Sequence, residues 1–175
     1  MARLLLDGYN LIGVLHRDMD KARLALLEAL ISYNKKRGHE ITVVFDGWRG
    51  GTREGTRTAH GGIRIIFSRL GETADVVIKH LIKENEGKGL IVVSSDREIQ
   101  RAAWAARAVP IGSEEFLERL SSKGEKTGTL NLYPMSPEED LEEEGPPGKR
   151  GRTFSKKETL SKKEKARERA LIKLR

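Results

Sequence analysis

Three aspartates in this sequence each follow a short run of apolar residues. Asp7 ends "RLLLD", Asp46 ends "ITVVFD" and Asp96 ends "LIVVSSD". In an open α/β sheet, ligands bind beyond the carboxyl ends of the parallel strands, so we expect these three side chains to converge there. Asp75, in "GETAD", lies in the first turn of a predicted helix and can point into the same crevice. The pattern therefore predicts a cluster of four carboxylates.

Carboxylates that share a crevice repel one another and raise one another's pKa unless a cation neutralises them. Oxygen ligands favour hard cations, so Mg²⁺ or Mn²⁺ is expected, whereas Zn²⁺ prefers His and Cys side chains. A divalent ion held beside phosphate suits phosphodiester hydrolysis. We therefore expect Asp7, Asp46, Asp75 and Asp96 to be metal ligands in a nuclease site. The alternative for each aspartate taken singly is a helix cap or a turn.

Polar residues beside these aspartates add further candidates. Asn10 follows the first aspartate and is either a turn residue or a group that holds a metal-bound water or a phosphate. Ser94 and Ser95 precede Asp96 and either end a strand, orient Asp96 or contact a phosphate.

The elements that must position these side chains alternate along the first 120 residues. Apolar runs predict strands at 3–7, 41–46, 63–68 and 90–96, with a short fifth strand at 109–112. Helical patterns cover 20–37, 73–86, 97–108 and 114–120, with Gly38 closing the first and Thr73 and Ser113 as candidate N-caps of the second and last. This alternation predicts an α/β fold with an open, mainly parallel sheet flanked by helices.

The segment 47–62, "GWRGGTREGTRTAHGG", is interpreted as a loop that grips substrate. Its glycines allow close backbone approach, and Arg49, Arg53 and Arg57 supply cations for phosphates beside the proposed metal. Trp48 either stacks on an unpaired base or packs against the strand end.

Charge is unevenly distributed along the chain of 175 residues, whose formal net charge is +7. Residues 1–120 carry 19 Lys and Arg against 16 Asp and Glu, whereas residues 149–175 carry 12 against 3. Between them lie the acidic run "PEEDLEEE" and a segment rich in Pro and Gly. We therefore expect a nuclease domain at 1–120, a linker at 121–154 and a basic extension at 155–175.

The basic extension repeats "SKKE" at 155 and 161, and both copies fit the capping-box pattern that begins a helix. Two interpretations remain open for it. It is either a solvated charged helix or disordered, or it is a second surface that binds RNA or a ribosome.

Composition excludes several classes of protein. The chain has no cysteine, so disulfides and thiolate metal sites are absent. No stretch approaches the roughly 20 apolar residues that span a bilayer, and we expect no membrane partner and a cytoplasmic location. A haloacid dehalogenase phosphatase needs Asp-x-Asp after the first strand, but position 9 is Tyr, and the Gly-x-Gly-x-x-Gly turn of dinucleotide-binding proteins is also absent.

The motifs "LLLDGYNLIG", "VVFDG", "HGGIRIIFSRLGETADVVI" and "VVSSDREIQ" together resemble the YacP-like branch of the NYN domains, relatives of the PIN-domain nucleases. The resemblance covers about residues 3–120 and implies a PIN-like fold that binds divalent metal and cleaves RNA. It assigns Asp7, Asn10, Asp75 and Asp96 to the catalytic site, with Asp46 as a further member. Many NYN relatives have Asp two places after the last motif Asp, where this chain has Glu98.

These observations predict a divalent-metal-dependent endoribonuclease acting on single-stranded RNA such as mRNA, with the ribosome as a candidate partner. Two alternatives stay open. A non-catalytic RNA-binding adaptor would use the Arg-rich loop and basic extension equally well, although it gains nothing from carboxylates that face a phosphate chain. A PIN-like or flap-type DNA nuclease would use the same chemistry.

Overall fold

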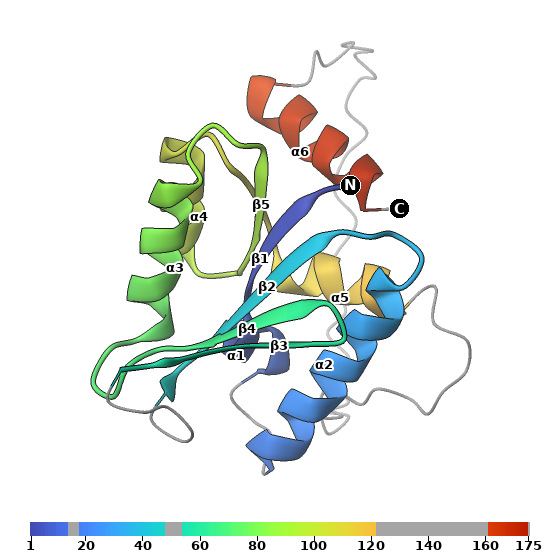
Figure 1. The fold of residues 1–175 in the computed structure, drawn as a ribbon. Helices are drawn as coiled ribbons and strands as arrows, with labels where there is room; N and C mark the ends of the chain where they lie inside the picture. The colour runs from blue at the N-terminus through green and yellow to red at the C-terminus, as the bar shows by residue number, and fades with distance from the viewer. Residues whose placement is uncertain (14–17, 48–53, 122–160, 175) are drawn as a thin grey trace, which may run out of the picture.

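The computed structural model describes residues 1–13, 18–47, 54–121 and 161–174. Within these ranges six strands form one sheet: β1 (Arg3–Asp7), β2 (Glu40–Phe45), β3 (Thr56–His60), β4 (Ile63–Phe67), β5 (Leu90–Val93) and β6 (Val109–Ile111). Their order across the sheet is β3-β4-β2-β1-β5-β6 (Figure 1). Every pairing is parallel except that of β3 with β4. The prediction of an open, mainly parallel α/β sheet is confirmed.

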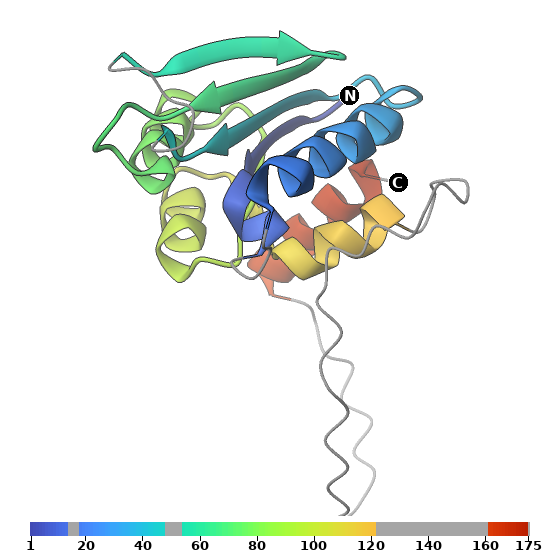
Figure 2. The ribbon, with the colours of Figure 1, turned by 90° about the horizontal axis from the view of Figure 1, so that it is seen from below.

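Helices cover both faces of this sheet. They are α1 (Gly8–Ile12), α2 (Met19–Asn34), α3 (Ala74–Glu84), α4 (Arg97–Ala105), α5 (Ser113–Ser121) and α6 (Lys162–Lys173). One face carries α3 and α4, and the other carries α1, α2, α5 and α6 (Figure 2). Among the described helices, none has the length and apolarity needed to cross a membrane.

Alternation along the strands decides which side chains share a face. Leu4 and Leu6 of β1 pack in the core beneath α2 and α5, whereas Leu5 packs in the core beneath α3 and α4. Because successive strand residues point to opposite faces, Asp7 lies on the same face as Leu5. The same rule puts Asp46 and Ser94 on that face, since they lie two residues after Val44 and Val92, respectively. Three polar groups therefore meet at the carboxyl edge on the side of α3.

The segment predicted as one loop from 47 to 62 contains a strand, so that prediction is wrong for residues 56–60. β3 pairs antiparallel with β4, and Gly61 and Gly62, with φ of 55° and 82°, form the turn between them. β3 is an edge strand whose side chains are mostly exposed. It has no apolar face that would reveal it, since its stability comes from backbone pairing with β4.

A second difference follows β1 directly, where the sequence predicted no element and α1 is found. Asp7 begins this short helix by accepting a hydrogen bond from the Asn10 backbone N–H at 3.1 Å. Gly8 is required here because a Cβ atom would lie 2.2 Å from the Phe45 ring. The glycine that disfavours a helix by propensity is thus needed for close packing.

The second of the two capping boxes is confirmed, since Ser161 and Glu164 cap α6 reciprocally. The helix packs against the body of the protein, where Ala170 and Leu174 are buried and the Tyr33 hydroxyl donates a hydrogen bond of 2.8 Å to the Leu174 carbonyl. Of the alternative interpretation, disorder does not describe residues 162–173, whereas a solvated charged helix does in part, since most side chains of α6 are exposed. The division at 120 and 154 stays a prediction, because residues 122–160 lie outside the described residues.

Candidate active site at the carboxyl edge of the sheet

Asp7 is the most buried acidic group at this edge, with 6% of its surface exposed. Its Oδ1 accepts the Asn10 backbone N–H, and its Oδ2 accepts the Ser94 hydroxyl at 3.0 Å. Burial raises the pKa of Asp7 to about 6, and repulsion from Asp75 and Asp46 adds to the rise while the two hydrogen bonds oppose it. A buried carboxyl group whose pKa is raised by burial and by neighbouring carboxylates is typical of a functional site.

Ser94 connects Asp7 with Asp96. Its hydroxyl donates to Asp7 and accepts the Asp96 backbone N–H at 3.1 Å, and the residue is fully buried. Gln100 donates to the Ser94 carbonyl at 2.9 Å. These contacts agree with the predicted role of Ser94 in orienting Asp96. The hydroxyl also holds the ends of β1 and β5 together.

Asp96 and Asp46 both cap helices that begin at this edge. Asp96 Oδ1 accepts the backbone N–H groups of Glu98 at 2.6 Å and Ile99 at 3.0 Å, so Asp96 is the N-cap of α4. Thr73 is the N-cap residue of α3, as predicted, but its side chain makes no capping bond, and Asp46 Oδ1 accepts the Ala74 N–H instead. A capping role, left open for each aspartate, is therefore real, and it leaves the second oxygen of each carboxylate for another partner.

Asp75 lies in the first turn of α3 and is half-buried. Burial raises its pKa, and repulsion from Asp96, Asp46 and Glu98 raises it further, while Lys79 opposes the rise. Lys79 itself pairs with Glu98 at 2.7 Å. Asp75 thus stands among like charges, and repulsion links all four predicted aspartates in one neighbourhood.

Asn10 is held by two serines from distant parts of the chain. Its Oδ1 accepts the Ser95 backbone N–H at 2.8 Å and the Ser113 hydroxyl. Ser95 Oγ in turn accepts the Ser113 backbone N–H at 3.0 Å. Because the Ser95 N–H needs an oxygen partner, the amide orientation of Asn10 is determined, and its Nδ2 group is left without a hydrogen bond among the described residues.

Of the predicted RNA-binding residues, Ser95 and Arg57 are described, and both are exposed. Arg57 lies on β3 opposite Ile66 of β4. Trp48, Arg49 and Arg53 lie outside the described residues, so their part in RNA binding stays a prediction.

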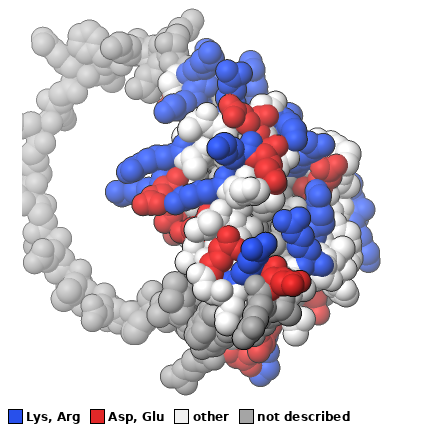
Figure 3. Space-filling model, turned by 60° about the vertical axis from the view of Figure 1, so that its left-hand side comes forward, with Lys and Arg blue, Asp and Glu red and all other residues white. Residues whose placement is uncertain are grey.

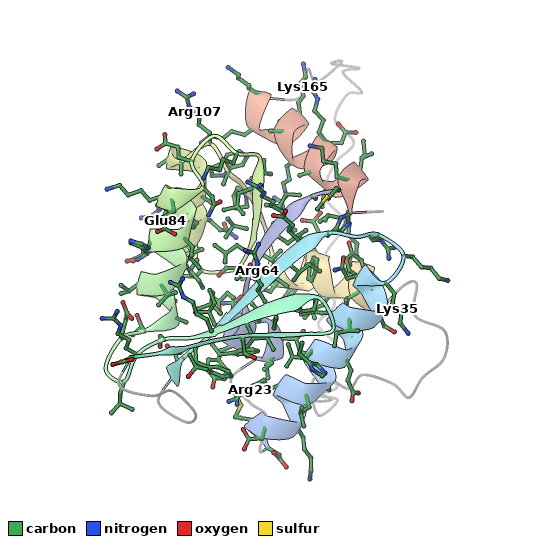
Figure 4. All side chains as sticks on the ribbon, in the orientation of Figure 1. Arg23, Lys35, Arg64, Glu84, Arg107 and Lys165 are labelled. Carbon is green, nitrogen blue, oxygen red and sulfur yellow. The ribbon has the colours of Figure 1, made fainter. Side chains whose placement is uncertain are left out.

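Two further residues at this edge were not identified from the sequence as parts of the site. Ser113 was expected to cap the helix at 114–120, but it begins α5 and its hydroxyl binds Asn10. Arg23 of α2 donates to the Tyr9 hydroxyl at 3.0 Å and lies over the rings of Phe45 and Phe67 at 5.4 and 5.2 Å (Figure 4). Neither has a local signal, since both act through tertiary contacts.

The donor set fits a hard divalent cation by its chemistry. The converging side chains offer carboxylate oxygens, and two of them have raised pKa values that a cation would relieve. Within the described residues, no three acidic or histidine side chains stand close enough together to hold an ion as they are placed.

Comparison with known proteins gives the same family as the sequence motifs, and the match extends beyond residue 120. The YacP-like NYN domain model matches residues 4–169. The uncharacterized protein YacP of Bacillus subtilis (strain 168) is 29% identical over 128 residues, which cover 68% of this chain and 75% of that protein.

Solved structures agree with the sequence comparison. The crystal structure of Rae1 (YacP) from Bacillus subtilis has a TM-score of 0.57 at 29% identity and covers 70% of this chain and 75% of that one. The crystal structure of a mutant of the same Bacillus subtilis protein has a TM-score of 0.58 at 27% identity and covers 70% and 76%. The chain therefore belongs to the YacP-like NYN domain family, a family of PIN-like nucleases.

Proposed function

We propose that this protein is a divalent-metal-dependent endoribonuclease that hydrolyses phosphodiester bonds in single-stranded RNA such as mRNA. The observation that carries the proposal is the raised pKa of Asp7 and of Asp75 among neighbouring carboxylates. Both have raised pKa values because they are partly or fully buried and face further carboxylates. Such an arrangement costs stability in the metal-free protein and is relieved by a cation.

Asp7, Asp46, Asp75 and Asp96 would hold Mg²⁺ or Mn²⁺. The ion would supply Lewis-acid chemistry. It would stabilise charge on the phosphoryl and leaving oxygens, and it would lower the pKa of water so that hydroxide is available to attack. Capping by Asp46 and Asp96 and the Ser94 bridge keep three of the ligands in place.

Asn10 and Ser95 would bind the scissile phosphate. The Asn10 Nδ2 group is a donor without a protein partner among the described residues, and its orientation is set by Ser95 and Ser113. The Ser95 hydroxyl accepts from Ser113 and retains its own proton for a phosphate oxygen. Arg57, with Trp48, Arg49 and Arg53, would contact the RNA on either side.

For the C-terminal helix we propose a separate contact with RNA or with the ribosome. Several cations of α6 are exposed: Lys162, Lys163, Lys165, Arg169 and Lys173. Replacing Lys165 and Arg169 with Gln tests this contact, because it removes charge and leaves the buried Ala170 and Leu174 in place. Unchanged binding to RNA would leave the ribosome as the partner to test by co-sedimentation.

Cleavage assays decide among the three candidate functions. Purified protein is incubated with single-stranded RNA, duplex RNA and DNA of matched sequence, with Mg²⁺, with Mn²⁺ or with a chelator. The proposal expects metal-dependent cleavage of the single-stranded RNA. Cleavage of DNA alone would support the DNA nuclease, and binding without cleavage under every condition would support the adaptor.

A further inference from the structure

A groove of about 700 Å³ lies over the face of the sheet that carries α3. The β3–β4 hairpin forms one wall, and the second half of α3 with the turn after it forms the other. The first residues of β1 and β2 form the floor. Its polar lining includes Arg3, Thr42, Arg57, Arg64, Asn85 and Lys88.

The groove leads to the candidate active site along a single strand. Glu40, Thr42 and Val44 of β2 alternate onto the α3 face, and Asp46 comes next in this alternation. Thr42 pairs with Arg64, and Ile66 pairs with both Val44 and Arg57. At roughly 3.3 Å per residue, the row that contains Arg57 lies about 7 Å from Asp46 along the strand, and the row that contains Arg64 lies about 13 Å away.

The charges that line the groove favour an anionic polymer. Four cations face two acids, Glu40 and Glu84. Glu40 binds Arg3 at 2.9 Å and lies 3.7 Å from Arg64, so one acid is shared between two guanidinium groups. Arg57 has no ion pair among the described residues. Figure 3 shows this side of the molecule, with Lys and Arg interspersed among Asp and Glu.

The lining also indicates which part of a nucleic acid would bind. None of the described residues that line the groove is aromatic, so they offer bases no platform on which to stack. Arginine, lysine, threonine and asparagine are the side chains that contact phosphates and sugars. A volume of about 700 Å³ lies within the range of clefts that bind small ligands.

We propose that this groove binds the phosphate backbone of a single RNA strand on one side of the bond to be cleaved. The inference rests on the proposed function and adds the route by which substrate reaches the carboxylates. Arg57 and Arg64 make the contacts, and Glu40 weakens them by neutralising part of the charge of Arg64.

The test measures binding to a long single-stranded RNA in chelator, where no metal-dependent cleavage occurs. Arg57→Gln with Arg64→Gln should weaken binding and lower the log–log salt slope by about 1.4, since each lost contact to a single strand removes about 0.7. Lys35→Gln with Lys36→Gln is the matched control. It removes the same charge from exposed positions after α2, remote from Arg64 (Figure 4).

Glu40→Gln supplies a change of opposite sign and should tighten binding. Equal slopes for the parent and the Arg57, Arg64 variant would overturn the inference. An equal loss in the Lys35, Lys36 control would also overturn it, because net charge alone would then explain binding. Thermal unfolding of each variant confirms that the fold is kept.

Binding and cleavage separate this inference from the proposed function. If the Arg57, Arg64 variant loses RNA binding while the parent cleaves nothing with any metal, the role of the groove is supported and the nuclease proposal is contradicted. If the parent cleaves RNA but the Arg57, Arg64 variant binds RNA like the parent, the nuclease proposal is supported and the role of the groove is contradicted.

Discussion

The carboxyl edge of the sheet and the contact of α6 with the body use charge in opposite ways. At the edge, Asp7 and Asp75 stand among like charges, and their pKa values are raised. Under α6, Arg167 pairs with Glu115, and Lys163 lies 5.6 Å from the centre of the Trp104 ring. The first region gives up stability, whereas the second adds to it.

This difference separates the effects that substitutions should have. A neutral residue at the edge removes repulsion and should not weaken the fold, although it removes a proposed ligand. A truncated residue under α6 should weaken the fold and leave the chemistry intact. A region that behaves otherwise has been assigned the wrong role.

The largest effect is expected from Asp7→Asn and Asp75→Asn. Each should lower cleavage by more than the roughly 10–100-fold that follows loss of a residue behind a metal ligand. Without metal, the stability should be unchanged or higher, since repulsion is relieved. Activity assays and chemical unfolding measure the two effects. A marked loss of stability would identify the aspartate as a structural hydrogen-bond centre instead.

The same two variants should also lose the stabilisation that Mg²⁺ or Mn²⁺ confers on the parent, because an ion that binds only the folded state raises its stability. Thermal unfolding with and without the ion gives this shift. A shift of full size in both variants would contradict their assignment as ligands.

The next effect concerns Leu174, which is 1% exposed under α6. Leu174→Ala should lower the free energy of unfolding by about 2 kcal/mol, near the low end for buried leucine because a terminal helix can shift to fill the space. Cleavage below the melting temperature should not change. Ile172→Ala is the control, since Ile172 is exposed and should alter stability by at most about 0.5 kcal/mol.

An effect of comparable size is expected from pH in the metal-free protein. The pKa of Asp7 is about 6 in the folded protein against 3.8 ordinarily, so between these values the folded state holds more protons than the unfolded state. Stability should therefore fall as pH rises through this window, by at most about 3 kcal/mol from this group. Urea unfolding of the parent and Asp7→Asn across this window isolates the contribution. Parallel curves would show that Asp7 does not titrate there.

The smallest effect is expected from Ser113→Ala, which removes the hydroxyl that binds Asn10. Cleavage should fall by about tenfold, at the low end for a residue behind the site, while stability falls by about 1 kcal/mol. Ser32→Ala, at an exposed position on α2, is the control. An unchanged cleavage rate would mean that Ser95 alone orients Asn10.

Local patterns were enough to predict the strands that carry apolar runs and the helices between them. Asp7, Asp46 and Asp96 were found because each ends or follows a strand, and Asp75 because it lies in the first turn of a predicted helix. β3 escaped prediction because its residues are polar and exposed, and α1 did because Gly8 disfavours a helix. In both cases a partner elsewhere in the chain, β4 or Phe45, makes the element stable.

The sequence by itself determined the order of the elements, the sign of the charges and the place of Asp7, Asp46 and Asp96 beside the strand ends, because these depend on neighbours in the chain. The tertiary structure decided that the Asp46 side chain, and not that of the N-cap residue Thr73, binds the first N–H of α3, that Ser113 binds Asn10, and that α6 packs on the body. It also decided which cations line the groove beside Asp46. Each of these joins residues far apart in the chain, and only the register and packing of the sheet bring them within reach.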